Sequence, residues 1–476
     1  MADILLIGAG TAGITAAIRA AKRGKRVVVI EKSGSVGGTL HYTAGHMSAA
    51  GTRLQQAAGI SDTPEQHFND VARISGNTMD AIITRKAVEL AAGTVNWLHE
   101  LGYPFHERSP AILYGHEAYS TARTYFGKND VNPAMNRPGK TIWQLLLPLW
   151  EEQINKGTIQ LITHCKLIGF QHANHQITGV VVENKGEQQI LSAQQYILTT
   201  GGYAANPSFF QAHTPGGSRL LSAANPASTG DGIKAVMNIG GIFWGGDKQM
   251  FTLGGIETEP GSGRIDFWNA WARMSNSRDR KQREIYVNDR GERCMNEYDW
   301  SVDQRERVIR EQPNKRCWVI FDAKALRDGD CIIPQWTAEQ LEEESVKGKS
   351  IWQADSIESL ASKTGLPLDS LQATVNGYNE ACLTQQDPQF QRTYLQHPIV
   401  TPPFFAILTY AYALISFGGI RVNEQLQVLT EGEIPINNLY AAGEVLGAAA
   451  TSGEAFCGGM LITPALSFGK WLGDTL

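Results

Sequence analysis

The sequence predicts an α/β fold in which one domain is assembled from both ends of the chain and a second, α+β domain is inserted between them. Residues 3–32 read as strand, glycine turn, helix and strand, and short strand-like pieces follow at 157–200. From about residue 243 the chain becomes polar and irregular with helical patches, and strand-like segments return near 402. With 476 residues, the chain is longer than one ordinary domain. The expected domains are 1–242 together with 396–476, and the insertion 243–395.

The composition excludes several classes of protein. A net charge of −5 without a long basic run argues against nucleic-acid binding. The chain has no run of 18 or more apolar residues, so no membrane span is expected. The six cysteines are scattered without CxxC spacing or a Cys/His cluster, which predicts reduced thiols and no metal site. Because the start of the chain lacks a signal-peptide pattern, we expect the protein in the cytoplasm.

The opening segment, "DILLIGAGTAGITAAIRAAKRGKRVVVIEK", predicts a buried strand, an Ala-rich helix and a second strand. Between the first strand and the helix, Gly8, Gly10 and Gly13 fit the spacing GxGxxG. These glycines permit a tight turn, close approach of a pyrophosphate and close helix–strand packing. Glu31 ends the second strand, 21 residues after Gly10, where an acid accepts hydrogen bonds from a ribose. The unit therefore predicts a dinucleotide site with the phosphates at the helix N-terminus.

Later segments repeat the alternation of strand, turn and helix. Residues 61–101 are amphipathic and predict helices. The motif "LTTGGY" (198–203) ends a predicted strand, and "STGDG" (228–232) opens a predicted helix. The motif "NLYAAGEV" (438–445) is a late strand that ends in an acid. The glycine pair in "FCGGMLITPALSFG" (456–469) precedes a further predicted helix, whose free N–H groups can stabilise negative charge.

Together with "SVGGTLHYTAGHMSAAGT" (35–52), "GERCMNEYDWS" (291–301) and "CWVIFD" (317–322), these motifs resemble the FAD-dependent fumarate reductase / succinate dehydrogenase flavoprotein superfamily. The resemblance includes its soluble branch of 3-ketosteroid dehydrogenases and covers essentially the whole chain. It implies a Rossmann-like FAD-binding domain with an inserted α+β cap, or substrate, domain. It also implies that FAD is held by Gly8, Gly10, Gly13, Glu31, Gly37, Gly38, Thr39, Gly45, Asp231, Glu444, Gly458 and Gly459.

The resemblance also bears on how FAD is attached. Membrane-bound relatives link FAD covalently through a His ahead of the glycine-rich segment, and Thr39 falls at that position in this sequence. We therefore expect FAD to be bound non-covalently. His41 lies two residues away, so a shift of register would restore the covalent alternative.

Three polar residues that act on the substrate in fumarate reductases are absent from the matching positions. The resemblance places Phe456 where an Arg clamps a carboxylate, Ser301 where a cap Arg donates a proton, and Ile415 where a His stands. A dicarboxylate would leave an unpaired, partly buried charge at these positions, which is costly. We therefore expect an apolar wall at Phe456, in a substrate pocket that also contains Ser416 and Arg123.

The branch that lacks these anchors acts on ketones. In that branch a Tyr and a Gly N–H bind the substrate carbonyl, and further tyrosines remove the α-proton. The Tyr next to the C-terminal glycines would fall at or beside Phe456, so its hydroxyl must come from elsewhere. Tyr298 on the cap is the first candidate for the catalytic base, followed by Tyr119 and Tyr412, although core packing also explains each tyrosine taken alone. The Gly459 N–H would hold the developing enolate oxygen.

The expected function is FAD-dependent α,β-dehydrogenation of a cyclic, largely apolar ketone, such as a 3-ketosteroid or a cyclohexanone-like compound. A tyrosine would take the α-proton, and flavin N5 would take the hydride. The alternative is a fumarate reductase-like ene-reductase for an unsaturated acid or ketone, with Arg123 or Arg305 in the carboxylate role. A non-enzymatic flavin-binding redox sensor or assembly factor is a third reading. The expected partners are a small-molecule substrate and an unknown electron acceptor.

Overall fold

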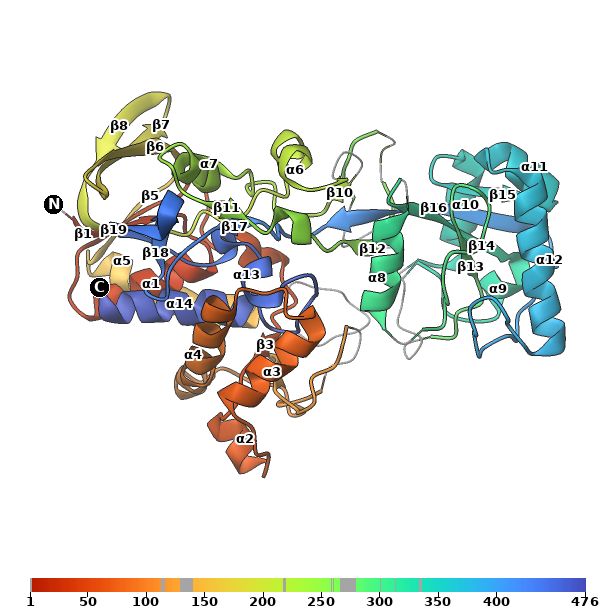
Figure 1. Cartoon of the computed structure of the whole chain (residues 1–476), viewed down its shortest axis with the longest axis horizontal. Coiled ribbons are helices and arrows are strands. Elements are labelled where there is room, and N and C mark those ends of the chain that lie inside the picture. Colours follow the sequence, from red (N-terminus) through yellow and green to blue (C-terminus); the bar gives the residue numbers. More distant parts are fainter. Residues whose placement is uncertain are drawn as a thin grey trace.

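The computed structural model describes residues 2–112, 116–128, 140–216, 220–257, 259, 261–265, 280–299, 301–312, 314–333 and 336–476. Two bodies, each built around its own sheet, lie next to each other along the long axis of the molecule, and both chain ends lie in the first body (Figure 1). Segments from the beginning and the end of the chain therefore share one body, and the predicted α/β class is confirmed.

The first body contains a six-stranded sheet in the order β18–β19–β9–β1–β2–β5. All neighbouring strands are parallel except β18 and β19, which pair antiparallel. Residues 4–7 of β1 are at most 2% exposed, because β1 lies between β9 and β2 and both faces of the sheet are covered. The strands are β1 (Ala2–Ile7), β2 (Val27–Ile30), β5 (Ile159–Ile162), β9 (Ala193–Leu198), β18 (Gln427–Thr430) and β19 (Ile434–Ala441).

Helices α1 and α14, from opposite ends of the chain, pack closely against each other below this sheet (Figure 1). A Cβ on Gly469 of α14 would lie 2.4 Å from the Ala12 carbonyl oxygen, and one on Gly473 would lie 2.4 Å from the Ala16 carbonyl oxygen. This approach therefore requires glycine. Helix α4 packs on α14, and α5 packs on α1. The helices are α1 (Thr11–Lys22), α4 (Ala81–Glu100), α5 (Thr141–Asn155) and α14 (Ile462–Thr475).

A small antiparallel sheet lies at the outer edge of the first body, with helix α7 against it (Figure 1). Its strands are β6 (Cys165–Ala173), β7 (Gln176–Asn184) and β8 (Glu187–Leu191), and α7 spans Asp231–Met237. The helix begins at Asp231, within "STGDG", the motif that the sequence predicts to open a helix.

The second body has its own sheet and its own apolar core. Strand β16, with the sequence FFAILTYAYA, lies at its centre and pairs with β10, β12, β14 and β15. Its residues 404–413 belong to the segment 396–476 that the sequence assigns to the FAD-binding domain. Nine of its ten residues are buried, so the strand needs cover on both faces and finds it in the second sheet. The domain boundaries near 243 and 396 stay a prediction.

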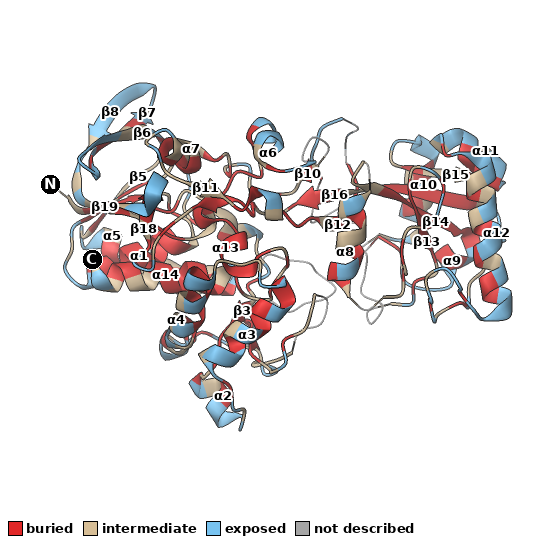
Figure 2. Ribbon diagram, in the orientation of Figure 1, coloured by how far each residue is buried: buried red, intermediate tan, exposed pale blue. Residues whose placement is uncertain are grey.

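The strands of both sheets are buried, whereas the outer faces of helices such as α11 and α12 are exposed (Figure 2). Helix α8 stands between the two bodies (Figure 1). The remaining strands are β3 (Met47–Ser48), β4 (Thr124–Tyr125), β10 (Leu221–Ser222), β11 (Phe243–Trp244), β12 (Thr252–Gly255), β13 (Ile285–Val287), β14 (Arg316–Asp322), β15 (Ile351–Ala354), β16 (Phe404–Ala413) and β17 (Gly419–Ile420). The remaining helices are α2 (Arg53–Ala57), α3 (Pro64–Ser75), α6 (Pro207–His213), α8 (Val302–Glu311), α9 (Ala323–Arg327), α10 (Ala338–Lys347), α11 (Ile357–Thr364), α12 (Leu368–Thr384) and α13 (Ala449–Ser452).

In the described part of the chain, every helix is too short or too polar to cross a lipid bilayer. All six cysteines are free thiols.

Candidate active site

A cavity of about 860 Å³ extends from the carboxyl ends of β1 and β2 to helix α8 of the second body. Ligands of open parallel sheets bind at this edge. The volume falls within the range of roughly 300–1,000 Å³ that is usual for small-molecule and cofactor sites. Because both bodies form its walls, the cavity can hold a cofactor at one end and a substrate at the other.

The cofactor end of the cavity begins at the glycine turn after β1. Gly8 has a φ of +105°, and a Cβ there would lie 2.5 Å from the Thr199 carbonyl oxygen. A Cβ on Gly13 would lie 2.1 Å from the Gly8 carbonyl oxygen, so α1 packs on β1 only with glycine at this position. At Gly10 the nearest atom to a Cβ is Thr199 O, at 3.9 Å, and α1 begins after Gly10 without a side-chain cap. The turn thus leaves space and N–H groups for a pyrophosphate.

Two acids hold the loops around this turn. Glu31 lines the cavity at the end of β2 and accepts hydrogen bonds from the Ala9 N–H at 2.9 Å and the Ser33 N–H at 2.8 Å. Asp231, at the first residue of α7, accepts from the Lys32 ammonium at 2.7 Å. Burial acts against ionisation of Asp231, but Lys32 holds the pKa of that carboxyl below its usual value. Sequence reasoning found both acids but missed Lys32, because no motif marks a lysine that meets its partner only in three dimensions.

Glu444, at the end of the late strand, is half-buried and lines the cavity. Its Oε1 accepts from the Ser416 N–H at 3.0 Å. Burial raises the pKa of Glu444 to about 7, against the opposing effect of hydrogen bonds from Ser416 and Thr39. Ser416 is fully buried, and its hydroxyl accepts from the Tyr203 N–H at 2.6 Å. Ser416, expected in the substrate pocket, therefore lies behind the cavity wall and supports Glu444.

Stability should decrease with rising pH because of Glu444. Its folded-state pKa of about 7 lies above its ordinary value of 4.5. The stability that Glu444 contributes is therefore fully present below pH 4.5 and is lost as pH rises through 7. This difference in pKa corresponds to roughly 3 kcal/mol of unfolding free energy. We expect urea unfolding at pH 5 and pH 8 to show a smaller pH effect for Glu444→Gln than for the wild-type protein. Equal pH effects in the two proteins would contradict the assignment.

Thr39 lies in the short 3-10 helix Gly38–Tyr42 and lines the cavity, whereas His41 points into its own loop. The His41 Nε2 lies 3.0 Å from the Val36 carbonyl oxygen, and the ring packs edge-on against Trp143 at 5.2 Å. This placement favours the predicted non-covalent attachment over the alternative through His41.

The substrate end of the cavity has an apolar wall. Phe456 lines it and packs edge-on against Phe417, with ring centroids 5.3 Å apart. Further apolar side chains on this wall are Ile112, Leu253, Leu414, Ile415 and Leu461. The role of Phe456 as a substrate wall stays a prediction.

Arg305 on α8 lines the same end of the cavity and is 1% exposed. Its Nη1 donates to the Glu297 carbonyl oxygen at 3.2 Å, whereas Nε and Nη2 have no hydrogen-bond partner among the described residues. Burial lowers the pKa of Arg305, and nearby acidic groups offset this effect only in part. A buried cation with unused donors is costly unless an anion or a carbonyl oxygen binds to it. The cavity therefore borders a buried cation with two unused donors.

The three candidate tyrosines are far from equivalent. Tyr119 lines the cavity, and its hydroxyl donates to the Gly458 carbonyl oxygen at 2.6 Å. Burial raises the pKa of Tyr119 well above its usual value. Tyr298 lies outside the cavity lining, where its hydroxyl accepts from Lys281 at 2.9 Å and its ring stacks on Tyr394. Tyr412 lies on β16 in an apolar cluster outside the lining.

Arg123 is also placed away from the cavity lining. It is fully buried and forms a bidentate ion pair with Asp62, at 3.0 and 2.9 Å, and a contact of 3.1 Å with Asp70. Its charge is therefore compensated within the fold. The expected cofactor residues that line the cavity are Gly8, Gly10, Glu31, Gly38, Thr39, Asp231, Glu444 and Gly458, and those behind its wall are Gly13, Gly37, Gly45 and Gly459.

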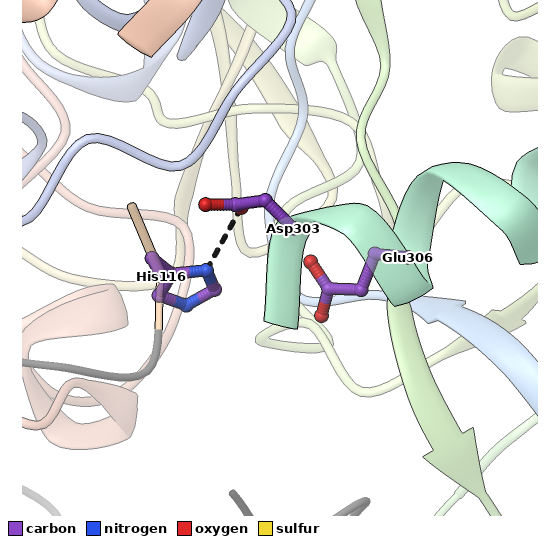
Figure 3. Close-up of side chains that lie close together, drawn as sticks. All are labelled: His116, Asp303 and Glu306. Atoms are coloured by element: carbon purple, nitrogen blue, oxygen red, sulfur yellow. Dashed lines mark hydrogen bonds and ion pairs between the residues drawn. The ribbon is translucent and has the colours of Figure 1, made fainter. Parts of the chain in front are cut away.

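His116, Asp303 and Glu306 come together at the substrate end, with ligand atoms within 4.8 Å of one another (Figure 3). His116 Nδ1 lies 3.0 Å from Asp303 Oδ1, and Asp303 Oδ2 accepts from the Glu117 N–H at 2.6 Å. The sequence predicted no metal site, and we assign none to this cluster because His116 and Asp303 already pair with each other. No local motif links His116 to Asp303, which lies 187 positions away in the chain.

A dinucleotide cradle that opens into a substrate cavity under a second body defines a flavin-dependent oxidoreductase. Residues 3–461 match the FAD binding domain family, FAD_binding_2, and the chain belongs to this family.

Relatives and solved structures extend the likeness to nearly the whole chain. A probable fumarate reductase of Shewanella frigidimarina is 26% identical over 478 residues, which cover 99% of this chain and 74% of that protein. A vinyl phenol reductase of Lactiplantibacillus plantarum is 27% identical over 478 residues, covering 95% of this chain and 91% of that protein. A 3-ketosteroid Δ1-dehydrogenase from Sterolibacterium denitrificans shares the fold, with a TM-score of 0.80 at 20% identity, covering 99% and 98% of the two chains.

FAD is the cofactor, and the protein is an FAD-dependent oxidoreductase that acts on CH–CH groups. The cavity fits FAD, because the Gly8–Gly13 turn leaves backbone open to phosphates and Glu31 stands at the end of β2.

Proposed function

We propose that this protein reduces a C=C bond conjugated to a single carboxylate, in a substrate with an apolar substituent. The observation that carries the proposal is the buried guanidinium of Arg305 at the substrate end of the cavity. Its Nε and Nη2 have no hydrogen-bond partner among the described residues. A carboxylate can accept hydrogen bonds from both of these nitrogens at once, in bidentate form. Arg305 was one of two arginines named for this role from the sequence, and Arg123 is committed to Asp62 and Asp70.

The wall around Phe456 favours a substrate with an apolar substituent. Phe456 and Ile415 present apolar surface, and Ser301 caps α8 instead of supplying a cation. A second carboxylate placed against these two side chains would lose hydration without gaining a partner from either of them. The relatives named above include two reductases of C=C bonds, which supports the same direction of reaction.

Each group has a defined task in this reaction. FAD, when bound and reduced, supplies the hydride to one alkene carbon. Arg305 holds the carboxylate and stabilises the negative charge that moves onto it as the other carbon becomes electron-rich. Phe456 and its apolar neighbours exclude water and orient the substituent. In this direction the unidentified redox partner is an electron donor rather than an acceptor.

The second candidate is the dehydrogenation of a cyclic, largely apolar ketone. The apolar wall and the placement of Tyr119 beside Gly458 favour it. The raised pKa of Tyr119 makes that phenol a weak source of the tyrosinate needed to take an α-proton. For this reason we place the ketone reaction second.

Anaerobic flavin absorbance measurements separate the candidates. Reduced holoenzyme should be reoxidised by cinnamate, which combines one carboxylate with an apolar arm, in the usual enzyme range of about 1–10³ per second. Fumarate and cyclohexenone should react more slowly, because each lacks one of these features. Bleaching of the oxidised enzyme by cyclohexanone or a saturated 3-ketosteroid, without reoxidation by cinnamate, would favour dehydrogenation instead. A flavin that responds to none of these compounds would indicate the sensor or assembly role.

A further inference from the structure

We infer that His116 is the residue that donates the proton in this reaction, and that Asp303 positions it. The inference rests on the proposed function for the direction of proton transfer. It concerns a position where fumarate reductases use an arginine and this chain has Ser301. The Ser301 hydroxyl accepts from the Gln304 N–H at the start of α8 and donates to Glu117 Oε1 at 2.8 Å, so its role there is structural.

The hydrogen bond between His116 and Asp303 fixes which ring nitrogen serves each purpose. An ionised carboxylate only accepts, so His116 Nδ1–H donates to Asp303 Oδ1 at 3.0 Å. The Asp303 side chain is fully buried, and its second oxygen is held by the Glu117 N–H at 2.6 Å. This is the arrangement by which a carboxylate orients an imidazole and stabilises its charged form. The transferable proton is then the one on Nε2.

His116 is placed where a substrate proton can be exchanged with solvent. It lines the cavity, and its ring lies 5.1 Å from that of Phe456 on the apolar wall. Arg305, which would hold the carboxylate, lines the same cavity from α8. The His116 side chain is 35% exposed, so water can return the proton after each turnover.

The two members of the pair come from different bodies. His116 belongs to a loop of the first body, whereas Asp303 belongs to α8 of the second (Figure 3). The donor is therefore oriented only when the bodies are arranged as in this structure. This couples closure over the substrate to the ability to deliver a proton.

FAD, when bound and reduced, would supply a hydride with its two electrons to one alkene carbon, and the former π pair would become the enolate held by Arg305. The His116 Nε2–H bond breaks, and its proton forms the C–H bond at the other carbon. Neutral imidazole then regains a proton from water. The charged groups around His116 are Glu117 beside it and Asp303, Arg305 and Glu306 on α8.

His116→Gln tests the assignment in the holoenzyme. Reoxidation of reduced flavin by cinnamate should slow by about 10²–10⁴-fold. In the wild type this rate should fall as pH rises and imidazolium is lost, and the variant should lack this alkaline decline. Asp303→Asn should slow the reaction and move the decline to lower pH. Cinnamate binding, read from the shift it causes in the oxidised flavin spectrum, should change less than threefold in His116→Gln.

His106→Gln is the control variant. It changes a histidine outside the cavity lining and should behave as wild type. A His116→Gln rate above one third of wild type would overturn the inference. So would a wild-type rate that is lost when a chelator is added and restored by Zn²⁺. If ketones reduce the flavin and cinnamate does not reoxidise it, the proposed function fails but His116 is still tested. His116 must then act as the base. In that case His116→Gln must slow flavin reduction and must abolish the loss of rate at low pH, otherwise the inference fails too.

Discussion

Arg305→Gln is expected to lower kcat/KM for cinnamate reduction by about 10²- to 10³-fold. Removing one partner of a buried charge pair costs about 3–4 kcal/mol, because the substrate carboxylate would enter the cavity without a cation. Arg305→Lys should recover only part of the loss, since an ammonium cannot form the two parallel hydrogen bonds of a guanidinium. Stopped-flow reoxidation of the reduced holoenzyme measures each rate.

Stability distinguishes this role from a packing role. Arg305 is a buried cation whose Nε and Nη2 lack partners among the described residues, so replacing it relieves an unfavourable burial in the free enzyme. The melting temperature of Arg305→Gln should therefore equal or exceed that of the wild type. Arg307→Gln, a change on the same helix outside the cavity lining, should leave kcat/KM unchanged. A destabilised Arg305→Gln with normal kcat/KM would show that the side chain serves the fold.

The parts that sequence predicted well are those in which local pattern and function coincide. The GxGxxG turn, in which a Cβ on Gly13 would lie 2.1 Å from the Gly8 carbonyl oxygen, is dictated by residues close together in the chain. The same holds for Glu31 at the end of β2 and for the strand that leads to Glu444. Such positions can be predicted from the sequence because a strand-to-helix turn places its own glycines and acids at the cofactor. The predicted FAD-binding fold is confirmed on this basis.

The substrate end was harder to predict, because its chemistry depends on pairs that only the fold brings together. The role of an arginine depends on whether its charge is already paired within the fold. Arg123 is neutralised by Asp62 and Asp70, whereas Nε and Nη2 of Arg305 have no hydrogen-bond partner among the described residues. The sequence shows two arginines and no difference between them. Likewise, the sequence favours Tyr298 on the cap as the catalytic base. Its hydroxyl instead accepts a hydrogen bond from Lys281, outside the cavity lining.

Glu297→Gln should lower the free energy of unfolding of the second body by about 3–5 kcal/mol. The Glu297 carboxylate is fully buried and accepts hydrogen bonds from Arg293 at 2.8 and 3.1 Å and from Arg392 at 3.1 Å. An amide of the same shape can accept from one of these cations but cannot neutralise either, so two guanidinium groups would be left underpaired in a low-dielectric core. Urea unfolding followed by tryptophan fluorescence measures the change.

Glu292→Gln provides the matched control for this prediction. Glu292 pairs with Arg290 at 2.8 Å, but both side chains are largely exposed, so water replaces the lost contact and the unfolding curve should overlay that of the wild type. Glu297 also holds α8, because its backbone oxygen accepts from Arg305 Nη1. A Glu297→Gln protein that is as stable as Glu292→Gln would mean that the buried cations are compensated by other groups, such as Asp387 beside Arg293. If instead the loss occurs as expected, the Glu297 carboxylate holds Arg293 and Arg392 in the core of the second body.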